Sequence, residues 1–132
     1  MKLLNSLFTV LSHTAADNRH DFCIRLDAEH FIYKAHFPGE PITPGVCIMQ
    51  MALELMEQAV GKPLDVKCVK NVKFLRIITP TEVAEVCYTL QKLTIEEQIV
   101  KCQIVVSAGD DVYAKLSLIC EMQSQDTCPD NC

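Results

Sequence analysis

The chain has 132 residues, the length of one domain. Apolar residues make up 49% and charged residues 22%, an ordinary globular composition that excludes a disordered tail protein and a fibre. Twelve basic and 17 acidic residues give a net charge of -5. This balance argues against a nucleic-acid partner, because such binding depends on basic residues that displace counterions.

The N-terminal residues and the apolar runs bear on membrane targeting. Asn5 and Ser6 interrupt the first apolar stretch, so we expect no cleaved signal peptide. No apolar run approaches the ~18 residues that a spanning helix requires, so we expect no membrane span.

Before residue 39 the pattern predicts two strands, over residues 6–13 and 20–27. Residues 29–37 are expected to be irregular or partly extended. His30 lies here, six residues before His36, and is a candidate to line the same pocket.

One helix is predicted after the loop at residues 39–45, and it ends at Gly61. Thr43 is the expected N-cap, Pro44 suits the first helical position, and Gly61 gives a stop. The helix is apolar almost all round, so we expect it to be buried on most sides. Its polar residues form one narrow stripe: Gln50, Glu54, Glu57 and Gln58.

Four further strands are predicted over residues 66–78, 83–93, 98–108 and 112–122, and the last three suit an antiparallel meander. A single buried helix needs a sheet that wraps it, so the expected fold class is α+β, an antiparallel sheet around one central helix. We expect one domain over residues 1–122 and a disordered tail over residues 123–132.

The eight cysteines are expected to be reduced thiols. Six of them lie singly in apolar stretches, where a thiol behaves as a small buried hydrophobe: Cys23, Cys47, Cys68, Cys87, Cys102 and Cys120. This usage indicates a cytoplasmic protein. No spacing of His, Cys, Asp and Glu fits a metal site, so neither a metal nor another cofactor is expected.

The stretch from His36 to Val46 carries the chemistry. Its three prolines and two glycines predict a precisely shaped loop that ends at a helix N-terminus. The N–H near Gly45 is placed to polarise a carbonyl, and His36 supplies a base nearby. The pair suits proton abstraction next to a carbonyl.

This stretch resembles the His-Phe-Pro-Gly-x-Pro-x-x-Pro-Gly-Val signature of the hot-dog-fold β-hydroxyacyl-acyl-carrier-protein dehydratases, and every fixed position matches. The resemblance implies a hot-dog fold and a lyase of fatty acid biosynthesis that removes water from a (3R)-hydroxyacyl thioester to give a trans-2-enoyl thioester. It implies that His36 acts on the C2 proton and that the Gly45 amide binds the thioester carbonyl. The implied substrate-binding residues are Phe37, Pro38, Gly39, Val46 and Gln50.

The resemblance also implies the partners. They are an acyl carrier protein or a coenzyme A thioester, and a second copy of the chain in a homodimer or a larger assembly of dimers. Each site would combine His36 of one chain with the helix stripe of the other. A concentration of positive charge at Lys67, Lys70, Lys73 and Arg76 would speed docking of an acidic carrier protein, although an ordinary solvated strand face explains it equally well.

One departure from the family pattern affects the chemistry. The family's catalytic Glu or Asp falls fourteen residues after the His, where this chain has Gln50, and an amide cannot donate a proton as an acid. Glu54 lies one turn later and is the candidate replacement, although one turn displaces a carboxylate by about 6 Å.

Three functions therefore remain open. The first is a dehydratase that uses Glu54 or a water as the acid. The second is a protein that binds acyl thioesters without turnover, or a partner subunit. The third is a hot-dog thioesterase in which Glu54 directs water.

Cys47 lies at the helix N-terminus, where its thiol is either a nucleophile or a small packed side chain, and packing is favoured.

Overall fold

The computed structural model describes residues 2–36 and 39–123. Within these ranges the chain forms six strands and two helices. In chain order they are β1 (Phe8–Ala16), β2 (Arg19–Leu26), α1 (Phe31–His36), α2 (Gly45–Val60), β3 (Leu64–Phe74), β4 (Glu85–Glu96), β5 (Ile99–Ala108) and β6 (Asp111–Met122).

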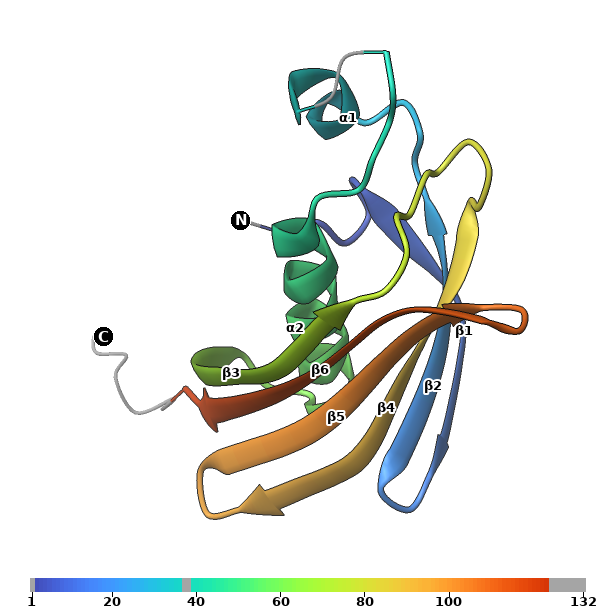
Figure 1. Cartoon of the computed structure of the whole chain (residues 1–132). Coiled ribbons are helices and arrows are strands. Elements are labelled where there is room, and N and C mark those ends of the chain that lie inside the picture. Colours follow the sequence, from blue (N-terminus) through green and yellow to red (C-terminus); the bar gives the residue numbers. More distant parts are fainter. Residues whose placement is uncertain (1, 37–38, 124–132) are drawn as a thin grey trace.

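The strands form one antiparallel sheet in the order β1-β2-β4-β5-β6-β3. The sheet curves, and α2 lies in its hollow (Figure 1). The meander β4-β5-β6 is present as expected, and the α+β class with a sheet around one long helix is confirmed. The sheet leaves β1 and β3 as its two edges.

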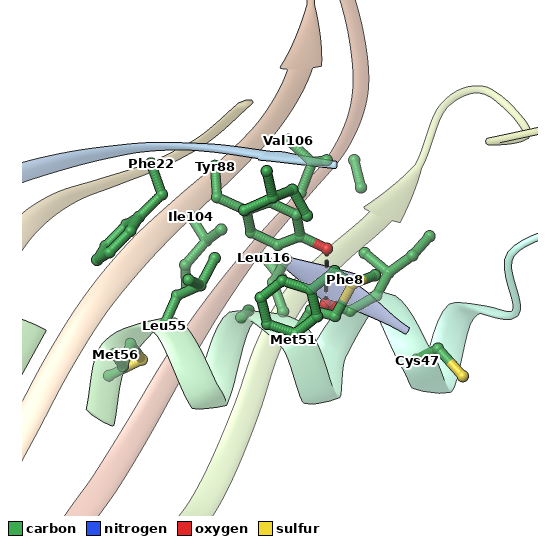
Figure 2. Close-up of a cluster of buried hydrophobic side chains, with 14 of the residues drawn as sticks. Phe8, Phe22, Cys47, Met51, Leu55, Met56, Tyr88, Ile104, Val106 and Leu116 are labelled. Atoms are coloured by element: carbon green, nitrogen blue, oxygen red, sulfur yellow. Dashed lines mark hydrogen bonds between the residues drawn. The ribbon is translucent and has the colours of Figure 1, made fainter. Parts of the chain in front are cut away.

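The long helix buries one face against the sheet. The buried apolar residues of this face are Cys47, Ile48, Met51, Ala52, Leu55 and Met56. They pack against inward side chains of the strands, and the buried hydroxyl of Tyr88 donates to the carbonyl of Ile48 at 3.1 Å (Figure 2). The predicted helix and its stop at Gly61, which has a φ of 80°, are confirmed.

The prediction that residues 29–37 are irregular or extended was wrong for the part that the structure describes. Residues 31–36 form α1. The backbone N–H of Ile32 donates to Nδ1 of His30 at 3.1 Å, so His30 caps the first turn of this helix. Ile32 and Tyr33 are buried and attach α1 to the core.

The strand predicted over residues 66–78 is shorter at its C-terminal end, because β3 stops at Phe74. The N–H groups of Leu75 and Arg76 instead both donate to the carbonyl of Tyr113. As an edge strand β3 has one unpaired side, and most of its side chains are exposed. It also carries exposed apolar residues, among them Val66, Val69 and Val72.

The cysteines within the described residues are all free thiols. Cys47, Cys102 and Cys120 are buried, as expected for small hydrophobes. The other three are half-buried, and Cys23 and Cys87 face each other across β2 and β4 with 3.0 Å between their sulfurs. The predicted tail lies outside the described residues, apart from Gln123.

Candidate functional site

The N-terminal end of α2 is built around Gly45. Pro44 is the N-cap, with an extended backbone (φ −64°, ψ 147°). The N–H groups of Cys47 and Ile48 donate to the carbonyl of Pro44 at 3.0 and 3.1 Å. The Gly45 N–H is the first of the helix, so no helix carbonyl precedes it to accept its hydrogen bond. A Cβ at position 45 would lie 2.8 Å from Cζ of Phe74, so a side chain here requires the Phe74 ring to move. Glycine therefore lets the β3 aromatic ring pack against the start of the helix.

Thr43 does not cap the helix, as the sequence had predicted, because α2 has no side-chain cap bond at its N-terminus. The Thr43 hydroxyl is 3.0 Å from the hydroxyl of Tyr33 on α1, and its N–H donates to the carbonyl of Ile78 at 2.9 Å. Burial raises the pKa of Tyr33, so this phenol stays protonated and able to hydrogen-bond. These contacts tie α1, the loop and the segment after β3 together.

His36 is the last residue of α1, and its side chain is exposed. Helix α1 lies beyond the N-terminal end of α2 (Figure 1). Gly39, in the same loop, has a φ of 90°, which glycine adopts readily, and Val46 is 57% exposed. The other two residues of the predicted site, Phe37 and Pro38, lie outside the described residues.

Glu54, the candidate acid, is buried in the middle of α2 with 3% of its surface exposed. Its Oε1 accepts hydrogen bonds from the backbone N–H groups of Leu3 at 3.0 Å and Leu4 at 2.7 Å. Its Oε2 lies 2.8 Å from the N–H of Leu3 and accepts a further bond from Nε2 of Gln50 at 2.9 Å. None of these three donors belongs to α1.

This arrangement uses Glu54 as an acceptor for the N-terminal segment. Leu3 and Leu7 are buried on either side of a tight turn that contains Asn5 at a φ of 65°. A carboxyl group that accepts from three donors has its oxygens committed, and to hold a proton that it could donate it must first give up one of those acceptor bonds. The contacts therefore favour an anchoring role for Glu54 over the role of proton donor.

The hydrogen bond between Gln50 and Glu54 also fixes the orientation of the Gln50 amide. Because Nε2 donates to Glu54, Oε1 of Gln50 faces away from the carboxylate. At this position the chain therefore has a neutral amide in place of a carboxyl group. The sequence predicted that both residues lie on one stripe, and the structure places them in contact.

Sequence reasoning missed the parts played by Leu3, Leu4, Tyr33 and Thr43. The first two act through backbone N–H groups, which carry no side-chain signature. The hydroxyls of Tyr33 and Thr43 were visible in the sequence, but their contact depends on α1, which was not predicted.

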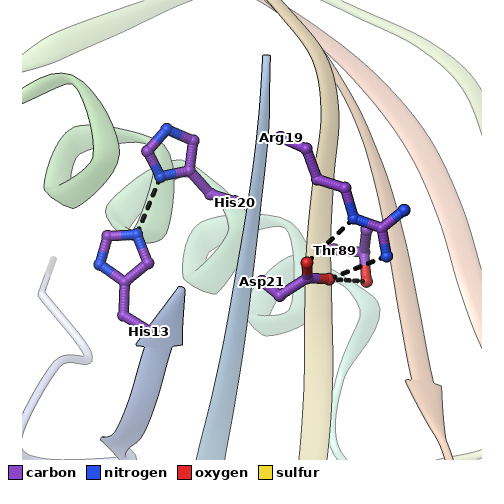
Figure 3. A network of polar contacts seen from close by, with 5 residues as sticks. All are labelled: His13, Arg19, His20, Asp21 and Thr89. Atoms are coloured by element: carbon purple, nitrogen blue, oxygen red, sulfur yellow. Dashed lines mark hydrogen bonds and ion pairs between the residues drawn. The ribbon is translucent and has the colours of Figure 1, made fainter. Parts of the chain in front are cut away.

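The remaining candidates act structurally. Burial raises the pKa of the Cys47 thiol, so its thiolate is disfavoured and packing is its role. His30 caps α1. His13 and His20 lie on β1 and β2 with 2.8 Å between their nitrogens, in the neighbourhood of the Arg19–Asp21 ion pair (Figure 3).

No group of three or more His, Cys, Asp or Glu side chains that could hold a metal ion occurs within residues 2–36 and 39–123. In the same ranges no helix has both the length and the apolar character that a bilayer crossing demands.

Comparison with known proteins places the chain in a family. The family model described as ApeI-like, ApeI dehydratase, matches residues 12–115. The 3-hydroxyacyl-[acyl-carrier-protein] dehydratase FabZ of Latilactobacillus sakei is 31% identical over 97 residues, which cover 68% of this chain and 69% of the relative. FabZ of Lactobacillus helveticus is 27% identical over 94 residues, 66% of this chain and 64% of the relative. The chain thus spans about two thirds of the length of these relatives.

Solved structures agree on the fold. The dehydratase heterocomplex ApeI:P from Xenorhabdus doucetiae has a TM-score of 0.68 at 13% identity, covering 86% of this chain and 96% of that one. The putative thioesterase yhdA from Lactococcus lactis also has a TM-score of 0.68, at 11% identity, covering 96% and 100%. The fold is the hot-dog fold, and the chain belongs to the ApeI-like dehydratase family.

Proposed function

We propose that this chain is a dehydratase subunit that binds a 3-hydroxyacyl thioester and supplies the base, while the acid of the complete reaction comes from a carboxyl group on the helix of a second chain. The reaction removes one proton from C2 and the hydroxyl from C3, and it yields a trans-2-enoyl thioester and water. The observation that carries this proposal is that Glu54 is committed to Leu3, Leu4 and Gln50.

The base and the carbonyl-binding group are those of the motif. His36 takes the C2 proton through its imidazole, and the Gly45 N–H donates to the thioester carbonyl, where negative charge develops as the proton leaves. Gln50 of this chain lies on the helix that contributes to the other site of such a dimer, where its neutral amide provides no acid.

A second chain is also supported by the surface of this one. His36 is exposed, and α2 has a partly exposed apolar stripe that contains Val46, Met49 and Leu53. The neighbouring edge strand β3 exposes further apolar residues. Pairing of this edge with another chain would cover them. The relative from Xenorhabdus is itself named a heterocomplex.

The test is complementation between two inactive chains. The wild type has the base and no acid, whereas the triple variant His36→Ala/Gln50→Glu/Glu54→Gln has the acid and no base. Co-expressed, the two should form mixed dimers with one complete site, and formation of the enoyl thioester should exceed that of either chain alone by about 100-fold or more. Mixed dimers no faster than the separate chains would contradict a shared site.

The second candidate function is thioester binding without turnover, in homodimers. It is favoured by Gln50, because a neutral amide at both sites of a homodimer provides no acid. In this case the wild type binds a 3-hydroxyacyl thioester in titration calorimetry, but no enoyl product accumulates with any partner. A thioesterase that uses Glu54 is less well supported, because the same hydrogen bonds occupy the carboxylate.

A further inference from the structure

A group of five lysines on the outer face of the sheet, which is the face turned away from α2, has no part in the proposed chemistry. We call it the lysine face. It consists of Lys70, Lys73, Lys92, Lys101 and Lys115, all with exposed side chains. These are five of the 12 basic residues of a chain whose net charge is -5.

The strand register shows why these residues are neighbours. Lys101 on β5 and Lys115 on β6 alternate with inward residues, so both point outward. Lys73 on β3 is directly opposite Lys115, and Lys70 is opposite Ser117. Ser117 in turn is opposite Gln103 of β5, which is opposite Gln91 of β4. A central row of neutral polar residues is thus flanked by lysines.

Two irregularities hollow this face. The register of β3 shifts between Lys70 and Lys73, where Asn71 has a φ of 55°, and the register of β4 shifts between Gln91 and Thr94, where Lys92 has a φ of 54°. Between them lie two adjoining hollows of about 250 and about 330 Å³. Both are lined by Asn71, Gln103 and Ser117.

The charges of the lysine face are not compensated within the described part of the chain. None of its five ammonium groups takes part in an ion pair with a described carboxylate. The sequence also has basic residues at positions 67 and 76, and these two do form ion pairs. Lys67 pairs with Glu121 at 3.2 Å, and Arg76 pairs with Asp111 at 3.5 Å. Like charges directly opposite on adjacent strands are destabilising, and the chain retains one such pair in Lys73 and Lys115.

We propose that the lysine face is a docking surface for an acidic polypeptide. Rows of outward residues are about 7 Å apart along the strands and adjacent strands about 5 Å apart, so the lysines span more than about 10 Å in both directions. This is too wide for one carboxylate or phosphate, and it matches carboxylates that repeat about every 5.4 Å along a helix. The amides and the hydroxyl of the central row fit the polar groups of such a partner.

Charge complementarity selects a local acidic surface over a long polyanion. Lysine ammoniums attract carboxylates without the bidentate geometry that arginine offers to phosphate, and the lysine face contains no arginine. The net charge of -5 on the whole chain repels a polyanion that extends beyond the face. This inference does not depend on the proposed reaction.

The test measures binding of a short fluorescent helical peptide, with glutamates along one face, to the full chain by anisotropy, with polyphosphate as a second probe. The face variant is Lys73→Gln/Lys101→Gln/Lys115→Gln. The matched control is Lys2→Gln/Lys34→Gln/Lys62→Gln, which makes the same change of charge at exposed positions away from the lysine face. Circular dichroism shows whether each variant is folded.

We expect the acidic peptide to bind the wild type, to lose about tenfold in affinity in the face variant, and to lose less than about twofold in the control. Added salt should weaken binding to the wild type more than to the face variant. Equal losses in the two variants, or no binding, would overturn the proposal. Tighter binding of polyphosphate through the same lysines would overturn it in favour of a phosphate polyanion.

Lys115→Gln alone should raise the Tm, because it removes the repulsion with Lys73, and an unchanged Tm would remove that part of the argument.

Discussion

The first turn of α2 and its third turn differ in what they have kept of the family's chemistry. At the first turn Gly45 follows an intact loop motif, and its lack of a side chain accommodates the ring of Phe74. At the third turn a buried glutamate holds the N-terminal segment, and one turn earlier position 50 carries an amide. One helix thus begins at an intact loop motif, while the side chain of Glu54 in its middle is committed to structure. We propose that the loop motif and the acid of the family are separable in this chain.

The largest expected effect follows from removing the anchor. Glu54→Ala leaves the N–H groups of Leu3 and Leu4 and the Gln50 amide without their acceptor in a buried place. We expect the free energy of unfolding in urea to fall by about 3 kcal/mol. Gln58→Ala, at an exposed position of the same helix, is the control and should change it by less than about 0.5 kcal/mol. Similar values for the two variants would mean that Glu54 is no anchor.

A carboxylate at position 50 should conflict with Glu54. In Gln50→Glu two carboxyl groups lie about as close as the present 2.9 Å contact, so they share a proton and one pKa of the pair is raised. The folded state then binds more protons than the unfolded state, so the free energy of unfolding is highest at low pH and falls as pH rises through the raised pKa. We expect a loss of about 2 kcal/mol between about pH 4 and pH 8, relative to the wild type. A difference that does not vary with pH would show that the pair is not in contact.

The first turn can be tested with two glycines. In Gly45→Ala the new Cβ displaces the Phe74 ring, and we expect about a tenfold loss of affinity for a 3-hydroxyacyl thioester in calorimetry, with the free energy of unfolding lowered by less than about 1 kcal/mol. Gly61→Ala, at the other end of α2 with a φ of 80°, should show the reverse pattern, about 1 kcal/mol lost and affinity retained. If Gly45→Ala binds as the wild type does, Gly45 has no place in the site.

The smallest expected effect concerns the contact between the hydroxyls of Tyr33 and Thr43, which ties α1 to the loop before α2. Tyr33→Phe and Thr43→Val each remove one partner of the hydroxyl contact. We expect each to lower the free energy of unfolding by about 1 kcal/mol, and the double variant to cost clearly less than the two losses added together. Additive losses would indicate that the two hydroxyls do not interact.

The long helix and the three-stranded meander could be predicted from the sequence. Helix α2 is marked by Pro44 and Gly61, and alternation reveals β4, β5 and β6. Helix α1 was missed because six residues are too few for a helical period, and its cap is the side chain of His30. The end of β3 was missed because it depends on pairing with β6, where the carbonyl of Tyr113 accepts from the two residues after the strand.

The candidate site was predictable only in part. The loop from His36 to Val46 matches a specific signature, and the same resemblance predicts a Glu or Asp at position 50, where this chain has Gln. The burial of Glu54 has no sequence signature, because the hydrogen bonds that it accepts are donated by backbone N–H groups about 50 positions away in the chain. A polar stripe on a helix ordinarily faces solvent, and only the docked N-terminal segment turns one of its members into a buried anchor.

The most direct measurement exchanges the two residues of the middle of α2. In Gln50→Glu/Glu54→Gln the new amide at position 54 can accept from Leu3 and Leu4 through its oxygen and donate through its nitrogen to the new carboxylate at position 50, which preserves the present pattern in reverse. We expect this variant to turn over a 3-hydroxyacyl thioester about 100-fold faster than the wild type, and His36→Ala to abolish the gain. The account is contradicted if the exchange brings no gain while Glu54→Gln alone abolishes turnover by the wild type, because Glu54 would then be the acid.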